Sequence, residues 1–161
     1  MTHANQSPAQ TNKTALRAGS SDVPVIGKAN PKTKLEAASA VHKLRGFIGR
    51  QQLVAIGELC RGEERQFFID KLVELAELVG SMPVTYETDG QGAQAIVWLH
   101  YFTPGGDWYI TERDVLDEQL QAFGMADLGC GGELGYISIV ELLACGVELD
   151  LHWQPRSLAV V

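Results

Sequence analysis

The stretch that most constrains the fold runs from Ala95 to Trp153, because it holds all three tryptophans and the longest apolar run of the chain. Residues 95–102 are apolar at every position except His100. Successive side chains of a strand point to opposite faces, so this segment would place apolar residues on both faces. Such a pattern is typical of a central strand that is covered on both sides.

A turn follows this first strand. The proline and two glycines at 104–106 fix one φ angle and admit positive φ at the others, which breaks the apolar run. Residues 108–111 then return to aromatic and β-branched side chains. The pattern therefore predicts a β-hairpin over residues 95–111.

Three further strands are predicted after the hairpin. Residues 121–128 and 133–137 have strand composition and are separated by a glycine-rich turn. Residues 147–153 alternate between apolar and polar side chains, and Pro155 ends the alternation.

Apolar residues at helical spacing predict three helices ahead of the strands, at residues 34–47, 51–60 and 63–79. A fourth and shorter helix is predicted at residues 139–144. There Ser138 and the glutamate three residues later fit a capping box.

The order of these elements predicts a single α+β domain over residues 34–155. Its N-terminal helices are expected to pack on a mainly antiparallel sheet of about five strands, with one short helix before the last strand. Residues 1–33 contain few large apolar side chains and are predicted to form a disordered tail. Residues 156–161 are predicted to form a short C-terminal tail.

The composition is that of an ordinary globular protein, with 45% hydrophobic and 20% charged residues among 161. No apolar run approaches the roughly 20 residues that span a bilayer, so no membrane contact is expected. The first residues lack the apolar region of a secretory signal, and the three cysteines are odd in number and widely spaced. These features predict reduced thiols in a cytoplasmic protein.

The charge is unevenly distributed along the chain. The whole chain has a net charge of −7, whereas residues 81–153 hold one arginine and twelve acidic residues, a net charge of −11. Phosphate groups repel such a surface, so direct binding of nucleic acid by the sheet half is disfavoured.

Three motifs carry a resemblance to a known family: TPGGDWYITERD at 103–114, QAFGMADLG at 121–129 and GGELGYISIVELL at 131–143. With them the chain resembles a family of uncharacterised small proteins, a domain of unknown function carried on bacterial plasmids and integrative conjugative elements. The residues that match the family pattern are Trp108, Thr111, Glu112, Gly124, Asp127, Leu128, Gly129, Glu133, Leu134, Gly135 and Tyr136. The resemblance covers about residues 95–153. It implies a mobile-element protein in a bacterial cytoplasm, and it implies no reaction.

His100, Asp150 and His152 could form a metal or acid–base site if their strands were neighbours. No HExxH or CxxC motif accompanies them. A lone histidine in an apolar strand is more often a hydrogen-bonded core residue, so no metal ligand and no cofactor is predicted.

Other residues with reactive side chains are also explained by structural roles. Cys130 could be a nucleophile, but its nearest basic residue in the sequence is Arg113. Glu112, Asp127 and Glu133 could act as paired carboxylates, although turn and cap roles suit them better. No catalytic residue is predicted from these groups.

The glycine stretches at 105–106 and 129–132 lack the Lys-Ser/Thr that follows a phosphate loop. Trp108, Tyr136 and Trp153 could stack on bases, but in a strongly acidic half their packing in the core is favoured.

These observations favour a non-enzymatic accessory or binding protein of a mobile genetic element that acts through protein–protein contact. Its expected partner is a host or element-encoded protein, for which a DNA-binding protein is one candidate. An acidic DNA mimic that inhibits a host defence fits the −11 charge, although acidic surfaces also serve solubility. The candidate interaction surface comprises Asp107, Glu112, Asp114, Asp117, Glu118, Glu148 and Asp150. The alternative is a small hydrolase or metal-dependent enzyme that uses His100, His152 and acidic residues.

Overall fold

The structure is a computed structural model that describes residues 30–161. Residues 1–29, which make up most of the predicted disordered tail, lie outside the described residues. The end of that tail is held against the domain. The backbone nitrogen of Lys32 donates to Asp70 Oδ1 at 2.7 Å, and its Nζ pairs with Glu77 at 2.9 Å.

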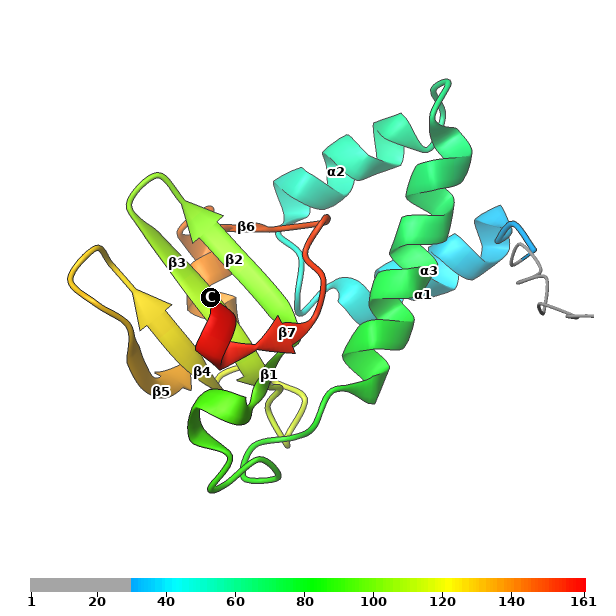
Figure 1. Ribbon diagram of the computed structural model, residues 1–161. Coiled ribbons are helices and arrows are strands. Elements are labelled where there is room, and N and C mark those ends of the chain that lie inside the picture. The colour runs from blue at the N-terminus through cyan, green and yellow to red at the C-terminus, as the bar shows by residue number, and fades with distance from the viewer. Residues whose placement is uncertain (1–29) are drawn as a thin grey trace, which may run out of the picture.

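Three helices precede the sheet, as predicted: α1 (Lys34–Leu44), α2 (Arg50–Leu59) and α3 (Arg65–Ser81). A capping box starts α1, because the Thr33 hydroxyl accepts from the Glu36 amide while the Glu36 carboxylate accepts from the Thr33 amide. Helices α1 and α3 pack against each other (Figure 1). The buried face of α3 consists of Ile69, Leu72, Val73, Leu75, Ala76 and Val79.

A five-stranded sheet forms the second part of the molecule (Figure 1). Its strands are β2 (Leu99–Thr103), β3 (Gly106–Glu112), β4 (Ala122–Asp127), β5 (Glu133–Ile137) and β6 (Glu148–Leu149). They lie in the order β5-β4-β3-β2-β6, and every neighbouring pair is antiparallel. Helix α4 (Ile139–Ala144) connects β5 to β6. The predicted α+β class and its arrangement are therefore confirmed.

The first predicted strand, residues 95–102, forms two separate strands, β1 and β2, and β1 belongs to a second, smaller sheet. Strand β1 (Ile96–Val97) pairs with β7 (Arg156–Ser157), after which a 3-10 helix, η2 (Leu158–Val160), ends the chain. A second 3-10 turn, η1 (Gly92–Gln94), precedes β1. Leu158 is buried, and its amide donates to the Ala95 carbonyl at 2.9 Å. The last residues, which the sequence pattern left outside the domain as a tail, thus pack on the sheet.

The last predicted strand, 147–153, is much shorter than its alternation indicated, because only β6 is extended. The Asp150 carboxylate accepts from the His152 amide at 2.8 Å, and the Asp150 carbonyl accepts from the Trp153 amide at 3.3 Å. These local bonds turn the chain and compete with continuation of the strand.

Helices and sheet share one hydrophobic core. At its centre, the hydroxyl of the fully buried Tyr101 donates to the Phe47 carbonyl at 2.7 Å. Burial raises the pKa of Tyr101 far above its ordinary value, so the group stays neutral and remains a donor.

At the start of α4 the Ser138 hydroxyl accepts from the Glu141 amide at 3.2 Å, which is one half of the predicted capping box.

The two edges of the sheet differ. At β6 the side-chain amide of Gln52 accepts from the Leu149 amide at 3.1 Å and donates to the Leu149 carbonyl at 2.7 Å, as a neighbouring strand would. At β5, no described residue bonds to the outward-facing backbone groups. Only the β5 edge is therefore open to another strand.

Across the described residues, none of the helices has the length and apolar character needed to cross a membrane.

Candidate functional site

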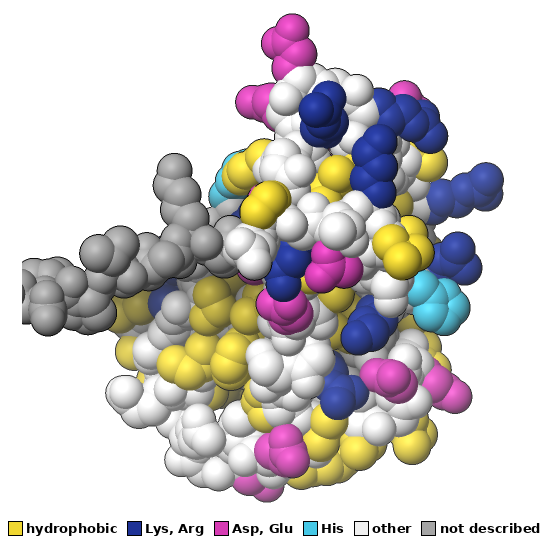
Figure 2. All heavy atoms as spheres, turned by 90° about the vertical axis from the view of Figure 1, so that its right-hand side faces the viewer, with side chains coloured by type: hydrophobic (Ala, Val, Ile, Leu, Met, Phe, Trp, Pro, Cys, Tyr) yellow, Lys and Arg dark blue, Asp and Glu magenta, His cyan; other side chains and the backbone are white. Residues whose placement is uncertain are grey.

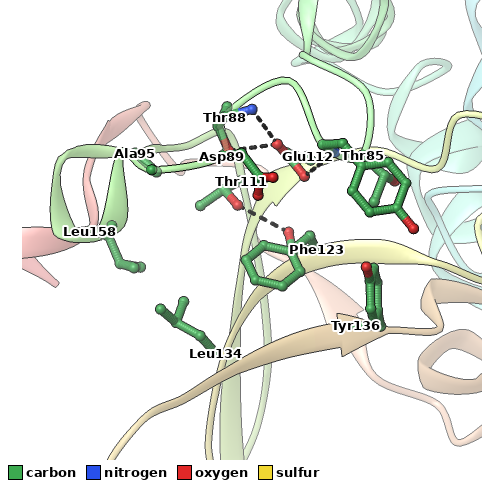
Figure 3. Close-up of a pocket in the computed structure, with 13 residues that line it drawn as sticks. Thr85, Thr88, Asp89, Ala95, Thr111, Glu112, Phe123, Leu134, Tyr136 and Leu158 are labelled. Atoms are coloured by element: carbon green, nitrogen blue, oxygen red, sulfur yellow. Dashed lines mark hydrogen bonds between the residues drawn. The ribbon is translucent and has the colours of Figure 1, made fainter.

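A pocket of about 300 Å³ lies on the face of the sheet opposite the helical core, beneath residues 85–92, here named the pocket loop (Figure 3). One end is apolar and is formed by Ala95, Leu134 and Leu158. The other end is aromatic and includes Phe123 and Tyr136, which rise from the paired strands β4 and β5.

A buried glutamate joins the sheet to the pocket loop. A register shift in β3 between Ile110 and Glu112 sets Glu112 opposite Phe123, and only 3% of Glu112 is exposed. Its carboxylate accepts from the Tyr86 amide at 3.0 Å, the Thr88 amide at 2.5 Å and the Thr88 hydroxyl at 2.6 Å (Figure 3). A buried charge is tolerated when it is hydrogen-bonded in this way. Glu112 therefore fixes the loop, since its Oε1 accepts both Thr88 donors and its Oε2 accepts the Tyr86 amide.

The pocket loop carries a strained aromatic residue. Tyr86 has a φ of 82°, a conformation that bulky side chains rarely adopt, and 61% of it is exposed. Its ring centroid lies 6.3 Å from that of Tyr136 at an interplanar angle of 70°. The Tyr136 ring in turn lies 5.6 Å from Phe123 at 76°. These edge-to-face pairs build a wall of three rings at the aromatic end.

The pocket is electronegative. Asp89 lines it beside Glu112, and none of the described residues that line it is a lysine or an arginine. The neighbouring Tyr86 side chain is the largest cause that raises the pKa of Tyr136, followed by burial and by the negative charges around it, including those of Asp89 and Glu112. An aromatic wall in a negative field attracts cations.

The acidic residues of the predicted interaction surface fall into separate environments. Glu112 and Asp114 are each only 3% exposed and so cannot contribute to a surface. Asp117 is exposed and pairs with Arg113 at 3.0 Å. Glu118 and Glu148 are exposed, and neither has an ion pair within residues 30–161.

The remaining two, Asp107 and Asp150, flank His100. Its Nε2 lies 2.8 Å from Asp107 Oδ1, and its Nδ1 lies 3.3 Å from Asp150 Oδ2. The ring also stacks on Tyr109, with centroids 4.9 Å apart. The carboxylates meet opposite nitrogens of the imidazole and do not converge on a common point.

His152 is directed elsewhere: its ring stacks on Phe67, with centroids 6.2 Å apart. Within the part of the chain that the structure describes, no three His, Cys, Asp or Glu residues are grouped to hold a metal ion. The structure thus brings together His100 and Asp150 of the predicted metal or acid–base alternative, whereas it directs the His152 ring to Phe67.

The other candidates have structural roles or are isolated. Asp127 accepts from the Gly129 amide at 2.8 Å, which is the turn role that the sequence indicated. Cys130 and Glu133 are exposed in and after the same turn. The Trp153 indole donates to the Val97 carbonyl at 3.1 Å, so this tryptophan holds β1 in place.

The sequence predicts residues 85–92 only as a polar loop that leads into the hairpin, and no pocket was predicted there because these residues follow no period. The only signals were its glycines and the position of Tyr86 in a polar segment.

Asp114 organises a second loop, residues 113–121. Its carboxylate accepts from the amides of Leu116, Leu120 and Gln121 at 2.8–3.1 Å. Burial acts to raise the pKa of Asp114, but the three amide bonds outweigh it and hold the pKa below its ordinary value. Asp117 and Gln119 in this loop have positive φ angles, so the loop depends on these bonds.

Replacing Asp114 by asparagine is expected to lower the free energy of unfolding at pH 7 by about 3 kcal/mol, since an amide cannot accept from three buried donors. Because the folded-state pKa is lowered, the stabilisation is complete above the ordinary carboxyl pKa of about 3.9 and is lost as pH falls through the folded value. Urea unfolding from pH 7 to pH 3 should show the difference between the two proteins shrinking in acid. Asp117→Asn, in an exposed pair, should change stability by less than about 1 kcal/mol. A gap that stays constant with pH would contradict this role.

Residues 72–157 match the family described as "Protein of unknown function (DUF2958)". The chain belongs to this family. The DUF2958 region begins within α3, contains all seven strands, and extends further than the motifs at residues 95–153 indicated. It includes every residue that lines the pocket except Leu158. No curated protein and no solved structure matches the chain.

Proposed function

We propose that this DUF2958 protein is a non-enzymatic binding protein that acts through protein–protein contact, and that its contact surface is the open edge of β5 together with the pocket beside it. A bacterial plasmid or integrative conjugative element is its proposed genetic setting, on the strength of the motif resemblance. A bacterial cytoplasm is its proposed location, which the three free cysteines fit.

The observation that carries this proposal is the composition of the β5 edge. Leu134 and Tyr136 are each more than half exposed on the strand, and Leu128 is 62% exposed just before it. Natural edge strands are ordinarily protected by charges, bulges or a covering segment, and Gln52 gives such cover to β6. An uncovered edge with apolar side chains suits a protein segment that adds as a further strand.

The test is capture of partners from a bacterial lysate by the tagged full-length chain. Replacing both Leu134 and Tyr136 by threonine removes the apolar contact and keeps residues that favour strands. We expect this double variant to retain about a tenth or less of the captured partner. Leu116→Thr, which removes a leucine that is 73% exposed in the 113–121 loop, should capture as much as the native chain. Equal capture by all three proteins would exclude the β5 edge as the contact.

A second form of the proposal is an acidic DNA mimic that inhibits a host defence protein, for which the −11 charge of residues 81–153 argues. On the face seen in Figure 2, Lys and Arg side chains lie among Asp and Glu side chains, whereas residues 81–153 hold one arginine and twelve acidic residues. Reversal of Asp117, Glu118 and Glu148 to lysine tests this form, because their side chains reach solvent whereas Asp114 is buried. Mimicry would be supported by a captured partner that meets three conditions. DNA displaces it from the protein, high salt releases it, and the triple lysine variant does not capture it.

The enzyme alternative, a hydrolase or metal-dependent enzyme using His100 and His152, would be favoured by tightly bound zinc in the purified protein or by an activity that His100→Ala abolishes in a folded chain.

A further inference from the structure

The aromatic end of the pocket combines a wall of three aromatic rings with a carboxylate that has no hydrogen-bond partner among the described residues. Tyr86, Phe123 and Tyr136 supply the rings. The Glu112 carboxylate adds negative charge but is occupied by three donors of the loop. Asp89 lines the same pocket, is exposed, and has neither a hydrogen bond nor an ion pair to any described residue. The pocket therefore offers the unpaired Asp89 carboxylate beside three aromatic rings.

We infer that this pocket binds the side chain of an arginine carried by an extended segment of a partner protein that adds to the edge of β5. The inference rests on the binding function proposed above and names the chemistry that the partner presents. Its basis is the charge complementarity between a guanidinium and a pocket that, within residues 30–161, is lined by Asp89 and Glu112 and by no basic residue.

Arginine suits this pocket better than lysine. A guanidinium is planar and weakly hydrated, so it stacks on aromatic faces and gives its paired N–H donors to one carboxylate. An ammonium is strongly hydrated and needs several acceptors to replace its water. Among the described residues that line the pocket, Asp89 is the carboxylate that no donor occupies, and the tyrosine hydroxyls are weaker acceptors.

The sheet geometry allows an extended segment to place an arginine side chain in the pocket. Leu134 and Tyr136 lie two residues apart on β5, so both side chains point to the face that holds the pocket. A strand added beside β5 would lie about 4.8 Å away and would direct every second side chain to that same face. An arginine at one of these positions projects over β5 toward Tyr136 and the pocket loop.

The probe is the peptide acetyl-Thr-Val-Arg-Val-Thr-amide, added to the full-length protein and followed by NMR. We expect amide shifts in the pocket loop and in β5, and saturable binding in the millimolar range. The same peptide with citrulline, which keeps the shape of arginine without its charge, should bind about tenfold more weakly. The lysine peptide should fall between the two. The inference would be overturned by any of three results: equal affinity for the arginine and citrulline peptides, amide shifts confined to other parts of the protein, or an absence of binding.

Variants separate a specific pocket from general attraction to an acidic surface. Tyr136→Leu, which keeps apolar bulk and removes a ring, should weaken the arginine peptide about tenfold. Asp89→Asn should weaken it about fivefold. Glu118→Gln removes one equivalent charge outside the pocket and should leave the affinity unchanged. Equal weakening by the Asp89 and Glu118 variants would overturn the inference. Mutation of the β5 edge could abolish capture of a partner that shows no preference for arginine. That result would support the proposed binding function and reject arginine as the ligand of the pocket.

Discussion

Replacing Gly124 by alanine is expected to destabilise the protein by about 3 kcal/mol or more, which is a large part of the stability of a small domain. Gly124 lies on β4 beside the register shift of β3. A Cβ at this position would meet the Tyr109 carbonyl oxygen at 2.1 Å and the Ile110 Cα at 3.0 Å. Both are backbone atoms of a paired strand, so no side-chain rotation relieves the overlap and the two central strands must separate.

Gly135 provides a matched control, because it is the direct cross-strand partner of Gly124 on β5. A Cβ at Gly135 would meet no atom within 4 Å. Gly135→Ala should therefore change the free energy of unfolding by less than about 0.5 kcal/mol. Urea unfolding followed by far-UV circular dichroism measures both variants. Similar stabilities for the two alanine variants would contradict the close strand approach.

Replacing Glu112 by glutamine is expected to lower the free energy of unfolding by about 3 kcal/mol and to loosen the pocket loop. The glutamine amide offers one accepting oxygen and turns an NH₂ group toward a backbone N–H, so at least one buried donor loses its partner. Hydrogen exchange at the amides of Tyr86 and Thr88 should accelerate more than exchange in α3, because these amides bond directly to the carboxylate.

Glu133→Gln is the control for the same chemical change at an exposed glutamate on β5, and it should leave stability and exchange unaltered. The Glu112 variant also separates two roles of this residue. If loop exchange were unchanged while stability fell, the carboxylate would support the sheet rather than the pocket loop.

Those parts of the fold that depend on local, periodic patterns could be predicted from the sequence. The three N-terminal helices, the hairpin of β2 and β3, and the elements β5 and α4 follow from apolar spacing, turn residues and the Ser138 cap. Where the prediction was wrong, a side chain or a distant segment determined the backbone. The Asp150 carboxylate turns the chain after β6, and β1 pairs with the distant β7 instead of continuing into β2 as one strand.

The candidate site was less predictable, because its parts come from five separate segments: residues 85–95, β3, β4, β5 and η2. The family motifs included Glu112, Leu134 and Tyr136, but sequence reasoning assigned Glu112 to an acidic surface. Its burial results from the register shift in β3 and from the donors of a loop that lies 24–26 residues earlier in the chain. A pattern of residue types contains neither piece of information, since both depend on which strands become neighbours.

The amide of Gln52 at the β6 edge has a consequence for stoichiometry. Because its side chain occupies the outward donor and acceptor of Leu149, the sheet can be extended on the β5 side alone. A chain whose sheet has two open edges can propagate into open-ended fibrils, whereas a chain with one open edge can pair through it with only one further copy of itself. Two copies joined through β5 would form a closed pair with no edge left for a third.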